Sequence, residues 1–404
     1  MHRIVMTGMG GICALGHNAK DIWKGMTEGR SGIGPVHHVD AKYLRKDAIA
    51  AEVSDFDPLQ YIDETRVPLM DPLSQYAVVA AGEAIRQAGL EFRNERAART
   101  AVVVGVGSAG EETREGLYQK LYAEQSNRFH PLGIVRIMSS APASHISMVH
   151  GITGPTFVVS SACASSNHAF TQAALMIRAG LVDTAVVGGT EACITLGVLR
   201  AWEAMRVLAP DTCRPFSINR RGLVLGEGSA MFVLETLEGA QARGATILAE
   251  LVGVGMSADA GDIAAPSEAG AAAAMQAALS DAGMRPDDID YINAHGTGTV
   301  ANDCTETRAI HSVFGEHARR LAVTSTKPMH GHALGAAGAL EMIAVVGALE
   351  HGIVPPTINY LGPDPACDLD YVPHEARAMR VRAALNNSFA FGGLNAVLAV
   401  RQAP

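Results

Sequence analysis

The sequence predicts an α/β protein, and two observations lead to that prediction. Short apolar runs rich in Val, Ile and Ala alternate with longer alanine-rich segments of helical periodicity, which is the pattern of buried strands connected by helices. After Gly244 a similar series begins again, so we expect two related halves, residues 1–245 and 246–404. No Pro/Ser-rich linker separates the halves, which favours one compact unit in which their polar turns face each other.

The first half is expected to combine strands with alanine-rich helices. The strands are predicted where Val, Ile and Thr predominate, at 3–8, 101–107, 156–162 and 184–190. The helices follow a period near 3.6, at 71–89, 139–150 and 163–180. Charged residues and weak periodicity at about 35–70 and 109–135 predict loops or a cap over a site.

The second half repeats the pattern of strand, polar Gly-rich turn and helix. Its strands are predicted at 247–258, 289–296 and 321–327, with two closing strands at 382–390 and 396–401. Its helices are predicted at 270–283, near 303–314, and at about 334–351.

The composition limits the classes of function. With 404 residues and 48% hydrophobic content the chain can bury a large core. A net charge of −9 gives no electrostatic reason to expect nucleic acid or an anionic membrane surface. The N-terminus turns to glycine after a few apolar residues, so we expect a cytoplasmic protein without membrane insertion. Six cysteines without a CxxC pair indicate reduced thiols.

One motif resembles a dinucleotide-binding turn. Residues 105–110 match GxGxxG after a predicted strand. Acidic residues follow directly, where a pyrophosphate needs a helix N-terminus free of negative charge, and no acidic residue ends a second strand about 20 residues later. We therefore expect close backbone packing or a wall of a substrate channel at this turn.

Cys163 lies among the small residues of SSACASSN, 160–167, at a predicted change from strand to helix. The positive end of the helix dipole and free N–H groups would favour a thiolate there, as in an activated nucleophile. A buried cysteine that acts as a small hydrophobe is the alternative.

Two turns of the second half carry histidines. NAHGTGT, 293–299, places His295 beside Thr297 and Thr299, whose hydroxyls could hold an amide-bearing chain. STKPMHGH, 325–332, adds Lys327 and two further histidines. There is no HExxH zinc helix, no GxSxG elbow and no GK[ST] phosphate loop.

With these motifs the sequence resembles the β-ketoacyl-acyl carrier protein synthases, the elongating condensing enzymes of the thiolase superfamily. The resemblance covers nearly the whole chain, through IVMTGMGG, SSACASS, RGLVLGEGSAM, NAHGTGTVANDCTE, STKPMHGHALGAAG and NNSFAFGGLNA. Within this family, residues 201–217 and 247–260 are most similar to the nodulation-protein E subgroup.

The resemblance implies a five-layered αβαβα thiolase fold with two duplicated halves. It implies a partner subunit, either a second copy or a related ketosynthase, and acyl carrier protein loaded with acyl or malonyl groups. It implies no metal and no cofactor, because the carrier protein itself brings the phosphopantetheine arm. The implied reaction is a decarboxylative Claisen condensation of an acyl-enzyme thioester with malonyl-carrier protein, in a specialised fatty-acyl or polyene pathway.

The resemblance also implies roles for single residues. They are the nucleophile Cys163, the decarboxylation pair His295 and His332 with Lys327, the oxyanion-hole and gate residue Phe391, the supporting acids Asp303 and Glu306, the pantetheine-binding Thr297 and Thr299, the acyl-pocket residues Ser108, Trp202 and Phe389, and the carrier-protein contact Arg206.

The sequence departs from the family pattern at several positions. Ala390 and Leu394 stand where the gate loop usually has glycine and threonine, His330 replaces a common threonine, and Ser108 replaces a bulky apolar residue. Residues 61–71 carry few basic side chains for carrier-protein docking, and Arg45 and Lys46 are as well explained as ordinary surface charges.

Two alternative functions are open at this point. The first is a non-catalytic, chain-length-factor-like subunit of a heterodimer, although such subunits usually lack the cysteine. The second is a thiolase, although thiolase chemistry uses a second cysteine as base.

Overall fold

The computed structural model describes residues 2–44 and 48–404. Ten of its strands form one sheet in the order β10-β9-β13-β14-β8-β1-β7-β6-β4-β5. The first half contributes β1 (Ile4–Cys13), β4 (Thr100–Gly105), β5 (Thr156–Val159), β6 (Thr184–Glu191) and β7 (Gly228–Thr236). The second half contributes β8 (Ala249–Ala258), β9 (Tyr291–Asn293), β10 (Ala322–Thr324), β13 (Ala383–Ala390) and β14 (Leu394–Gln402).

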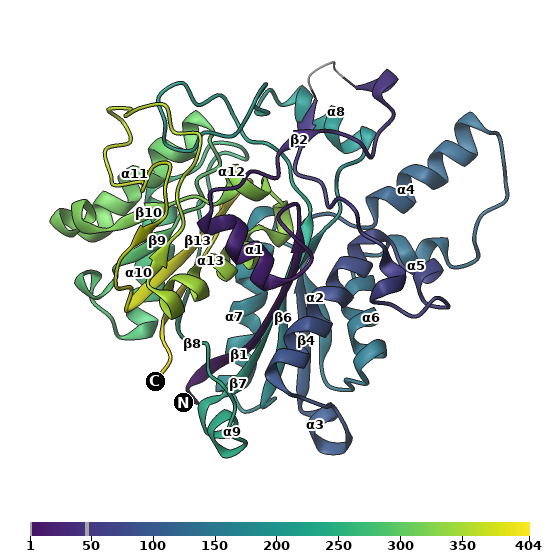
Figure 1. Ribbon diagram of the computed structural model, residues 1–404, viewed down its shortest axis with the longest axis horizontal. Helices are drawn as coiled ribbons and strands as arrows, with labels where there is room; N and C mark the ends of the chain where they lie inside the picture. The colour runs from purple at the N-terminus through teal and green to yellow at the C-terminus, as the bar shows by residue number, and fades with distance from the viewer. Residues whose placement is uncertain (1, 45–47) are drawn as a thin grey trace.

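The two sets of strands have the same topology. Numbered within its own half, each set has the order third, second, fourth, fifth, first. The sets join where β1 pairs antiparallel with β8, from Ile4 opposite Leu251 to Met6 opposite Ala249. The duplicated halves expected from the sequence are thus confirmed, and in Figure 1 they lie side by side. The boundary at 245 and 246 stays a prediction.

Helices complete the layers. The outer layer of the first half contains α2 (Pro72–Ala88) and α6 (Ala141–His150), and that of the second half contains α10 (Glu268–Ala282) and α11 (Val300–Phe314). Between them α7 (Ser165–Arg178) and α13 (Ala337–His351) contact strands of both halves. Three large apolar clusters fill the spaces between the layers, so the order αβαβα is confirmed.

Local sequence explains why the polar turns lie together within each half. Strand β4 runs parallel to β5 and β6, and β9 runs parallel to β10 and β13. The carboxyl ends of parallel strands lie at one edge of a sheet, so the turns that follow them are neighbours. Helices then begin with ordinary signals: Asp71 caps α2 by accepting the N–H of Leu73, and Gly89 ends it in a left-handed conformation.

The remaining elements lie around this framework. The helices are α1 (Ala19–Thr27), α3 (Asn94–Ala98), α4 (Glu111–Tyr118), α5 (Gly133–Ile137), α8 (Leu196–Ala204), α9 (Leu237–Ala242) and α12 (Lys327–His330). Two small antiparallel pairs join β2 (Gly34–Pro35) with β3 (Ile49–Ala50), and β11 (Ile353–Val354) with β12 (Arg377–Ala378).

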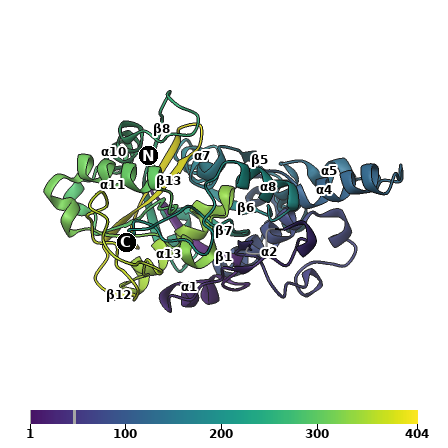
Figure 2. The same cartoon turned by 90° about the horizontal axis from the view of Figure 1, so that it is seen from above.

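Three sequence expectations need correction. The segment 109–135 is largely helical. Its helices α4 and α5 belong to an arm that projects from the body (Figures 1 and 2). Strand β7 in the middle of the sheet was not predicted. Cys163 does not begin a helix: it lies in a single 3₁₀ turn, Ala162–Ala164, and α7 starts at Ser165.

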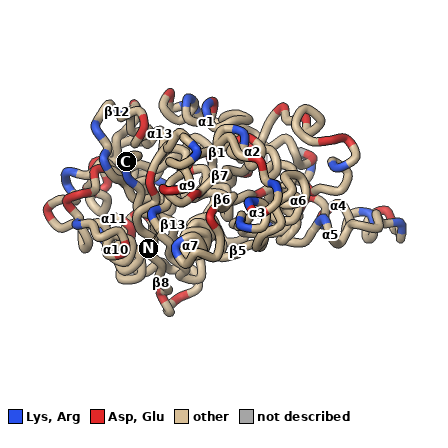
Figure 3. The backbone as a smooth tube through the Cα atoms, turned by 90° about the horizontal axis from the view of Figure 1, so that it is seen from below, with Lys and Arg blue, Asp and Glu red and all other residues tan. Residues whose placement is uncertain are grey.

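Charge and hydropathy agree with this arrangement. In the view of Figure 3, Lys and Arg are interspersed with Asp and Glu along the backbone. Within residues 2–44 and 48–404, one helical segment, Leu334–His351, is long and apolar enough to span a membrane, but 89% of that segment is buried inside the protein. It is the central helix of the core.

The packing of α2 against β1 gives a test of the fold. A Cβ on Gly10 would overlap the carbonyl oxygen of Ala80 and lie 2.6 Å from the Cβ of Glu83. We expect Gly10→Ala to destabilise the protein by about 2 kcal/mol or more, since α2 would have to move from the sheet. Gly116→Ala is the matched control, because a Cβ there meets no atom within 4 Å. Urea and thermal unfolding measure both, and equal midpoints would contradict the packing described.

Candidate active site

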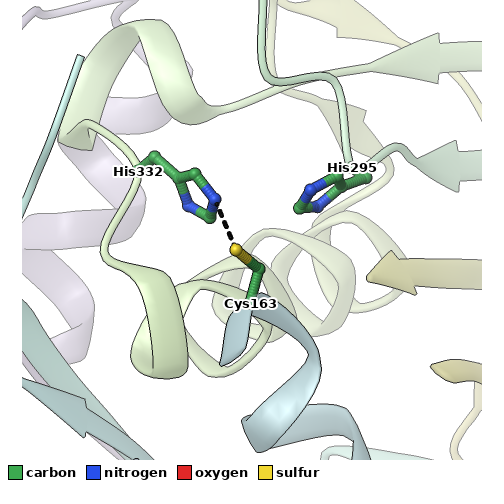
Figure 4. A group of neighbouring side chains, drawn as sticks. All are labelled: Cys163, His295 and His332. Carbon is green, nitrogen blue, oxygen red and sulfur yellow. Dashed lines mark hydrogen bonds between the residues drawn. The ribbon is translucent and has the colours of Figure 1, made fainter. Parts of the chain in front are cut away.

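Three side chains from separate turns meet at the junction of the two halves (Figure 4). Cys163 follows β5, His295 follows β9, and His332 follows α12. The Nε2 atom of His332 lies 3.1 Å from the Cys163 sulfur. The two imidazole centroids are 5.4 Å apart, and all three residues are at most 3% exposed. A thiol therefore has one imidazole in hydrogen-bond contact and a second beside it.

Small side chains shape the turn that presents Cys163. Ala162 has a φ of +48°, a left-handed conformation that costs a residue with a Cβ about 1 kcal/mol or more. The Ser165 hydroxyl stabilises the turn, since it accepts the N–H of Ser161 at 2.9 Å and donates to the carbonyl of Ala162 at 2.7 Å. The sequence SSACASSN thus forms a tight turn with the sulfur on the cavity side.

The structure corrects the expected state of the thiol. Burial raises the pKa of Cys163 to about 12, against the smaller lowering effects of Lys327 and of the backbone N–H groups of Cys163 and Phe391. The sulfur lies in a 3₁₀ turn before the helix, so the helix dipole has little effect on it, and desolvation determines the pKa of the thiol. The resting residue is a thiol, and its activation depends on transfer of the proton to a base such as His332.

Burial has the opposite effect on the imidazoles. It lowers the pKa of both His295 and His332 well below the ordinary value, and the positive charge of Lys327 lowers it further. Both rings are therefore neutral near pH 7, and each carries one N–H and one free nitrogen. Neutral rings can donate a hydrogen bond to an oxyanion without protonating a nearby carbanion.

Lys327 is completely buried and fixes the His295 turn. Its ammonium donates to the carboxylate of Glu341, on α13, and to the carbonyl oxygen of His295. Burial raises the pKa of the Glu341 carboxyl, and Lys327 opposes the rise. The counterion of this buried ammonium is therefore Glu341.

Two buried acids accept hydrogen bonds from backbone N–H groups of the His295 turn. Glu306 accepts the N–H groups of His295 and Gly296, each at 2.8 Å, and burial raises its pKa. Asp303 accepts the N–H of Phe216 at 2.7 Å and that of Gly298 at 3.2 Å, and burial raises its pKa to about 6. Asn302 donates a side-chain N–H to each acid and Asn387 donates one to Glu306, and neither acid lines the cavity.

Two cavities meet at Cys163. The first is a channel, and its walls include His295, His332, Thr297, Thr299 and Phe389–Gly393. The second is almost entirely apolar, and its walls include Ser108, Ala162, Val198, Trp202, Leu334 and Phe391. Phe391 lines both cavities, and its ring lies 5.9 Å from that of Trp202, which lines the second.

Most residues singled out in the sequence lie on these cavities, but Phe389, expected in the acyl pocket, lines the channel and not the apolar cavity. Arg206, which is exposed, lines neither of them, although its neighbours Met205 and Val207 do. His330 is buried and turned to Thr326, whose hydroxyl lies 2.9 Å from its Nε2, and burial lowers its pKa to about 3. Arg45 and Lys46 lie outside the described residues.

The gate loop tolerates its unusual residues in this structure. Ala390 and Leu394 form the last pair of the β13–β14 ladder. The turn itself is Phe391–Gly393, and only Gly392 and Gly393 have positive φ, at 83° and 70°. Neither Ala390 nor Leu394 therefore needs the backbone freedom of glycine.

Sequence reasoning did not find two parts of the site. Glu341 is the counterion of Lys327, and the available signal was an acidic residue in the middle of the apolar helix predicted at 334–351, whose other acid, Glu350, lies at its end. The segment Ile263–Pro266 lines the channel opposite the gate, and the Gly392 N–H donates to the carbonyl of Ile263 at 2.8 Å. Nothing in its local pattern distinguishes this segment from a surface loop.

Among the described residues, Cys163, His295 and His332 are the group whose sulfur and nitrogen donors lie within 4.8 Å of one another, as metal ligands would. The ammonium of Lys327 close by disfavours a further cation there. That the protein works without a metal stays a prediction.

Comparison with known proteins agrees with the motifs. Residues 1–240 match the family model "Beta-ketoacyl synthase, N-terminal domain", and residues 248–361 match "Beta-ketoacyl synthase, C-terminal domain". Nodulation protein E of a Rhizobium species is 52% identical over 400 residues, 99% of either chain. The 3-oxoacyl-[acyl-carrier-protein] synthase 2 of a Synechocystis species is 40% identical over 408 residues, 99% of this chain and 98% of that one. The solved structure of the ishigamide ketosynthase/chain length factor superposes with a TM-score of 0.93 at 38% identity, over 100% of both chains.

The state of the thiol can be tested by its reactivity. In His332→Ala, where no imidazole accepts the thiol proton, we expect the rate of Cys163 alkylation by iodoacetamide to rise about tenfold per pH unit from pH 7 to 9 without a plateau, because the raised pKa leaves a small thiolate fraction throughout. Mass spectrometry of the Cys163 peptide measures the rate, and N-acetylcysteine is the unburied control. A plateau below pH 8 would mean that a thiolate exists at rest.

Proposed function

The chain belongs to the beta-ketoacyl synthase family of condensing acyltransferases, and we propose that it extends an acyl chain by two carbons through condensation with malonyl-acyl carrier protein. The observation that carries the proposal is the meeting of one thiol with two neutral imidazoles at the junction of a channel and an apolar cavity. That geometry suits an acyl-enzyme intermediate with a second substrate arriving beside it.

In the first step Cys163 takes the acyl group from its carrier protein. The sulfur attacks the thioester carbonyl, its proton passes to the Nε2 of His332, and the carrier thiol leaves with that proton. The backbone N–H groups of Cys163 and Phe391 point at the sulfur, and are placed to stabilise the oxyanion of the tetrahedral intermediate. The product is a Cys163 thioester and a free carrier protein.

In the second step the malonyl thioester loses carbon dioxide. The electron pair of the broken C–C bond forms an enolate, whose oxygen receives hydrogen bonds from the neutral rings of His295 and His332. The enolate carbon attacks the Cys163 thioester and expels the sulfur as a thiolate, which gives a β-ketoacyl-carrier protein, and a proton from solvent then restores the resting thiol. Thr297 and Thr299 line the channel where the phosphopantetheine arm would lie. No dissociable cofactor is required, since decarboxylation drives the C–C bond formation.

The acyl group would occupy the apolar cavity beyond Cys163. Ser108 is small, and its hydroxyl donates to Glu191, so its oxygen places no free donor in the cavity wall. The flat rings of Trp202 and Phe391 at the entrance suit a planar chain. We therefore propose a long acyl group with conjugated or multiple double bonds, in a specialised fatty-acyl or polyene pathway.

The arm and the edge of the sheet suggest where a partner subunit binds. Strand β5 is an edge strand, and its residues are half-buried. Large apolar side chains of the arm are exposed, among them Tyr118, Tyr122, Phe129, Leu132 and Ile134. An open strand edge beside exposed apolar residues is a pairing surface. We propose a dimer, with a second copy or with a related ketosynthase, and a cytoplasmic location.

A non-catalytic role is the second candidate, because the ishigamide ketosynthase structure pairs a synthase with a chain length factor. The contact between Cys163 and His332 favours the catalytic subunit of such a pair.

Mass spectrometry of the intact protein tests the reaction. We expect adducts on wild-type protein mixed with acyl-carrier proteins of varied length and unsaturation, with the unsaturated chains highest, and none on Cys163→Ala. His332→Ala should slow adduct formation about 100-fold, as expected for loss of a general base. Absence of any adduct on the wild type would contradict an autonomous enzyme and favour the partner-dependent subunit.

A further inference from the structure

Glu191 is a fully buried acid that the proposed reaction does not use. It ends β6, and its carboxylate accepts four hydrogen bonds. One oxygen accepts the N–H of Gly107 and that of Gly335, both at 2.9 Å. The other accepts the N–H and the hydroxyl of Ser108. A single side chain thus binds turns that belong to different halves of the chain.

The backbones around Glu191 approach more closely than any side chain would allow. A Cβ on Gly335 would overlap the amide nitrogen of Gly107, and one on Gly107 would lie 2.6 Å from the Glu191 carboxylate. A Cβ on Gly189 would overlap the hydroxyl of Ser166. The three glycines and Glu191 form one rigid junction, which we call the Glu191 junction.

The Glu191 junction is linked to both reacting groups. Gly335 lies three residues after His332, and Ser166 lies three residues after Cys163. The Ser166 hydroxyl donates to the carbonyl of Gly335, so the same peptide turn is held from the cysteine side as well. On its other side, the backbone of His332 is fixed by the carbonyl of Val224 at 2.7 Å.

We propose that Glu191 is a positioning residue: by binding the N–H groups of Gly107 and Gly335 it holds His332 against the thiol of Cys163. Because β6 and the cysteine turn belong to one half and the His332 turn to the other, this contact sets their separation. The inference rests on the proposed function, in which His332 takes the thiol proton.

Charge gives the positioning a second consequence. Burial raises the pKa of Glu191 to about 7, and its negative charge in turn raises the pKa of the Cys163 thiol. Removal of the charge therefore makes the thiol easier to ionise above pH 7. Below pH 6 Glu191 is mostly protonated in the wild type, so removal of the charge changes nothing there.

The test is a double-mutant cycle read by iodoacetamide alkylation of Cys163, which requires no carrier protein. In the wild-type background we expect His332→Ala to slow alkylation at least about tenfold. In the Glu191→Ala background the same substitution should slow it less than about twofold, since His332 is no longer held at the sulfur. Glu191→Gln should restore the tenfold dependence, because its amide oxygen can still accept from Gly107 and Gly335.

The pH profile supplies a readout that a purely structural role would not move. Glu191→Gln should alkylate about threefold faster than wild type at pH 8 and equally at pH 6. Glu83 offers the matched control: it is also a carboxylate whose pKa burial raises, and it accepts the N–H groups of Gly11 and Ala19, at 2.9 and 3.0 Å. In Glu83→Ala and Glu83→Gln, both the His332 dependence and the pH profile of alkylation should be the same as in the wild type.

A full tenfold His332 dependence in Glu191→Ala would overturn the proposal. If Glu191→Ala does not fold, Glu191→Met keeps most of the side-chain volume and removes the oxygens that accept from Gly107 and Gly335, and an undiminished His332 dependence there would overturn the proposal as well. Failure of the proposed function is a separate result: a wild type that no acyl-carrier protein modifies can still show the coupling of Glu191 with His332.

Discussion

Close approach of backbone behind Cys163 and His332 is the constraint on which the site depends. The sulfur of Cys163 lies 3.1 Å from His332 only because glycines occupy the contacts behind both residues. A Cβ on Gly105 would lie 2.5 Å from the backbone of Ser165 and Ser166, directly behind the cysteine turn. Another on Gly226 would meet the Gly331 backbone at 3.0 Å, directly before His332. The glycines therefore set the reacting distance, and the large core holds them in place.

Desolvation then decides the protonation states. The same burial that brings the groups together keeps Cys163 a thiol and both histidines neutral. The buried positive charge on Lys327 is matched by Glu341 on the central helix. A site built this way holds donors ready for an oxyanion and produces the thiolate only when a base and a substrate are in place. The low dielectric strengthens each of these hydrogen bonds.

Much of the fold and of the catalytic group was predictable, because strands, turns and helices repeat with simple periods. The pattern placed Cys163, His295 and His332 on turns after strands, which is where they lie. What it could not give was the environment of each group. The prediction of a thiolate from the helix dipole was wrong, because it considered the local turn and not the burial of the Cys163 sulfur by the other half of the chain. Glu341 and Glu191 lie far in sequence from the groups they hold, so no local spacing points to them. The sequence predicts loops or a cap for the arm and misses its helices, because these helices expose apolar residues instead of burying a stripe.

The duplication explains the misleading GxGxxG match. Strand β4 is the second strand of the first half and β9 is the second strand of the other, so the turn at 105–110 is the structural counterpart of the turn that carries His295. In the same way the Cys163 turn after β5 corresponds to the Lys327 to His332 segment after β10. Each half therefore offers two equivalent turns to the junction, and three of the four carry reacting groups. The fourth, at 105–110, carries none: its glycines let Glu191 reach the backbone, and its Ser108 lines the cavity. A glycine-rich turn in this fold is thus explained by contact with the other half, without a nucleotide.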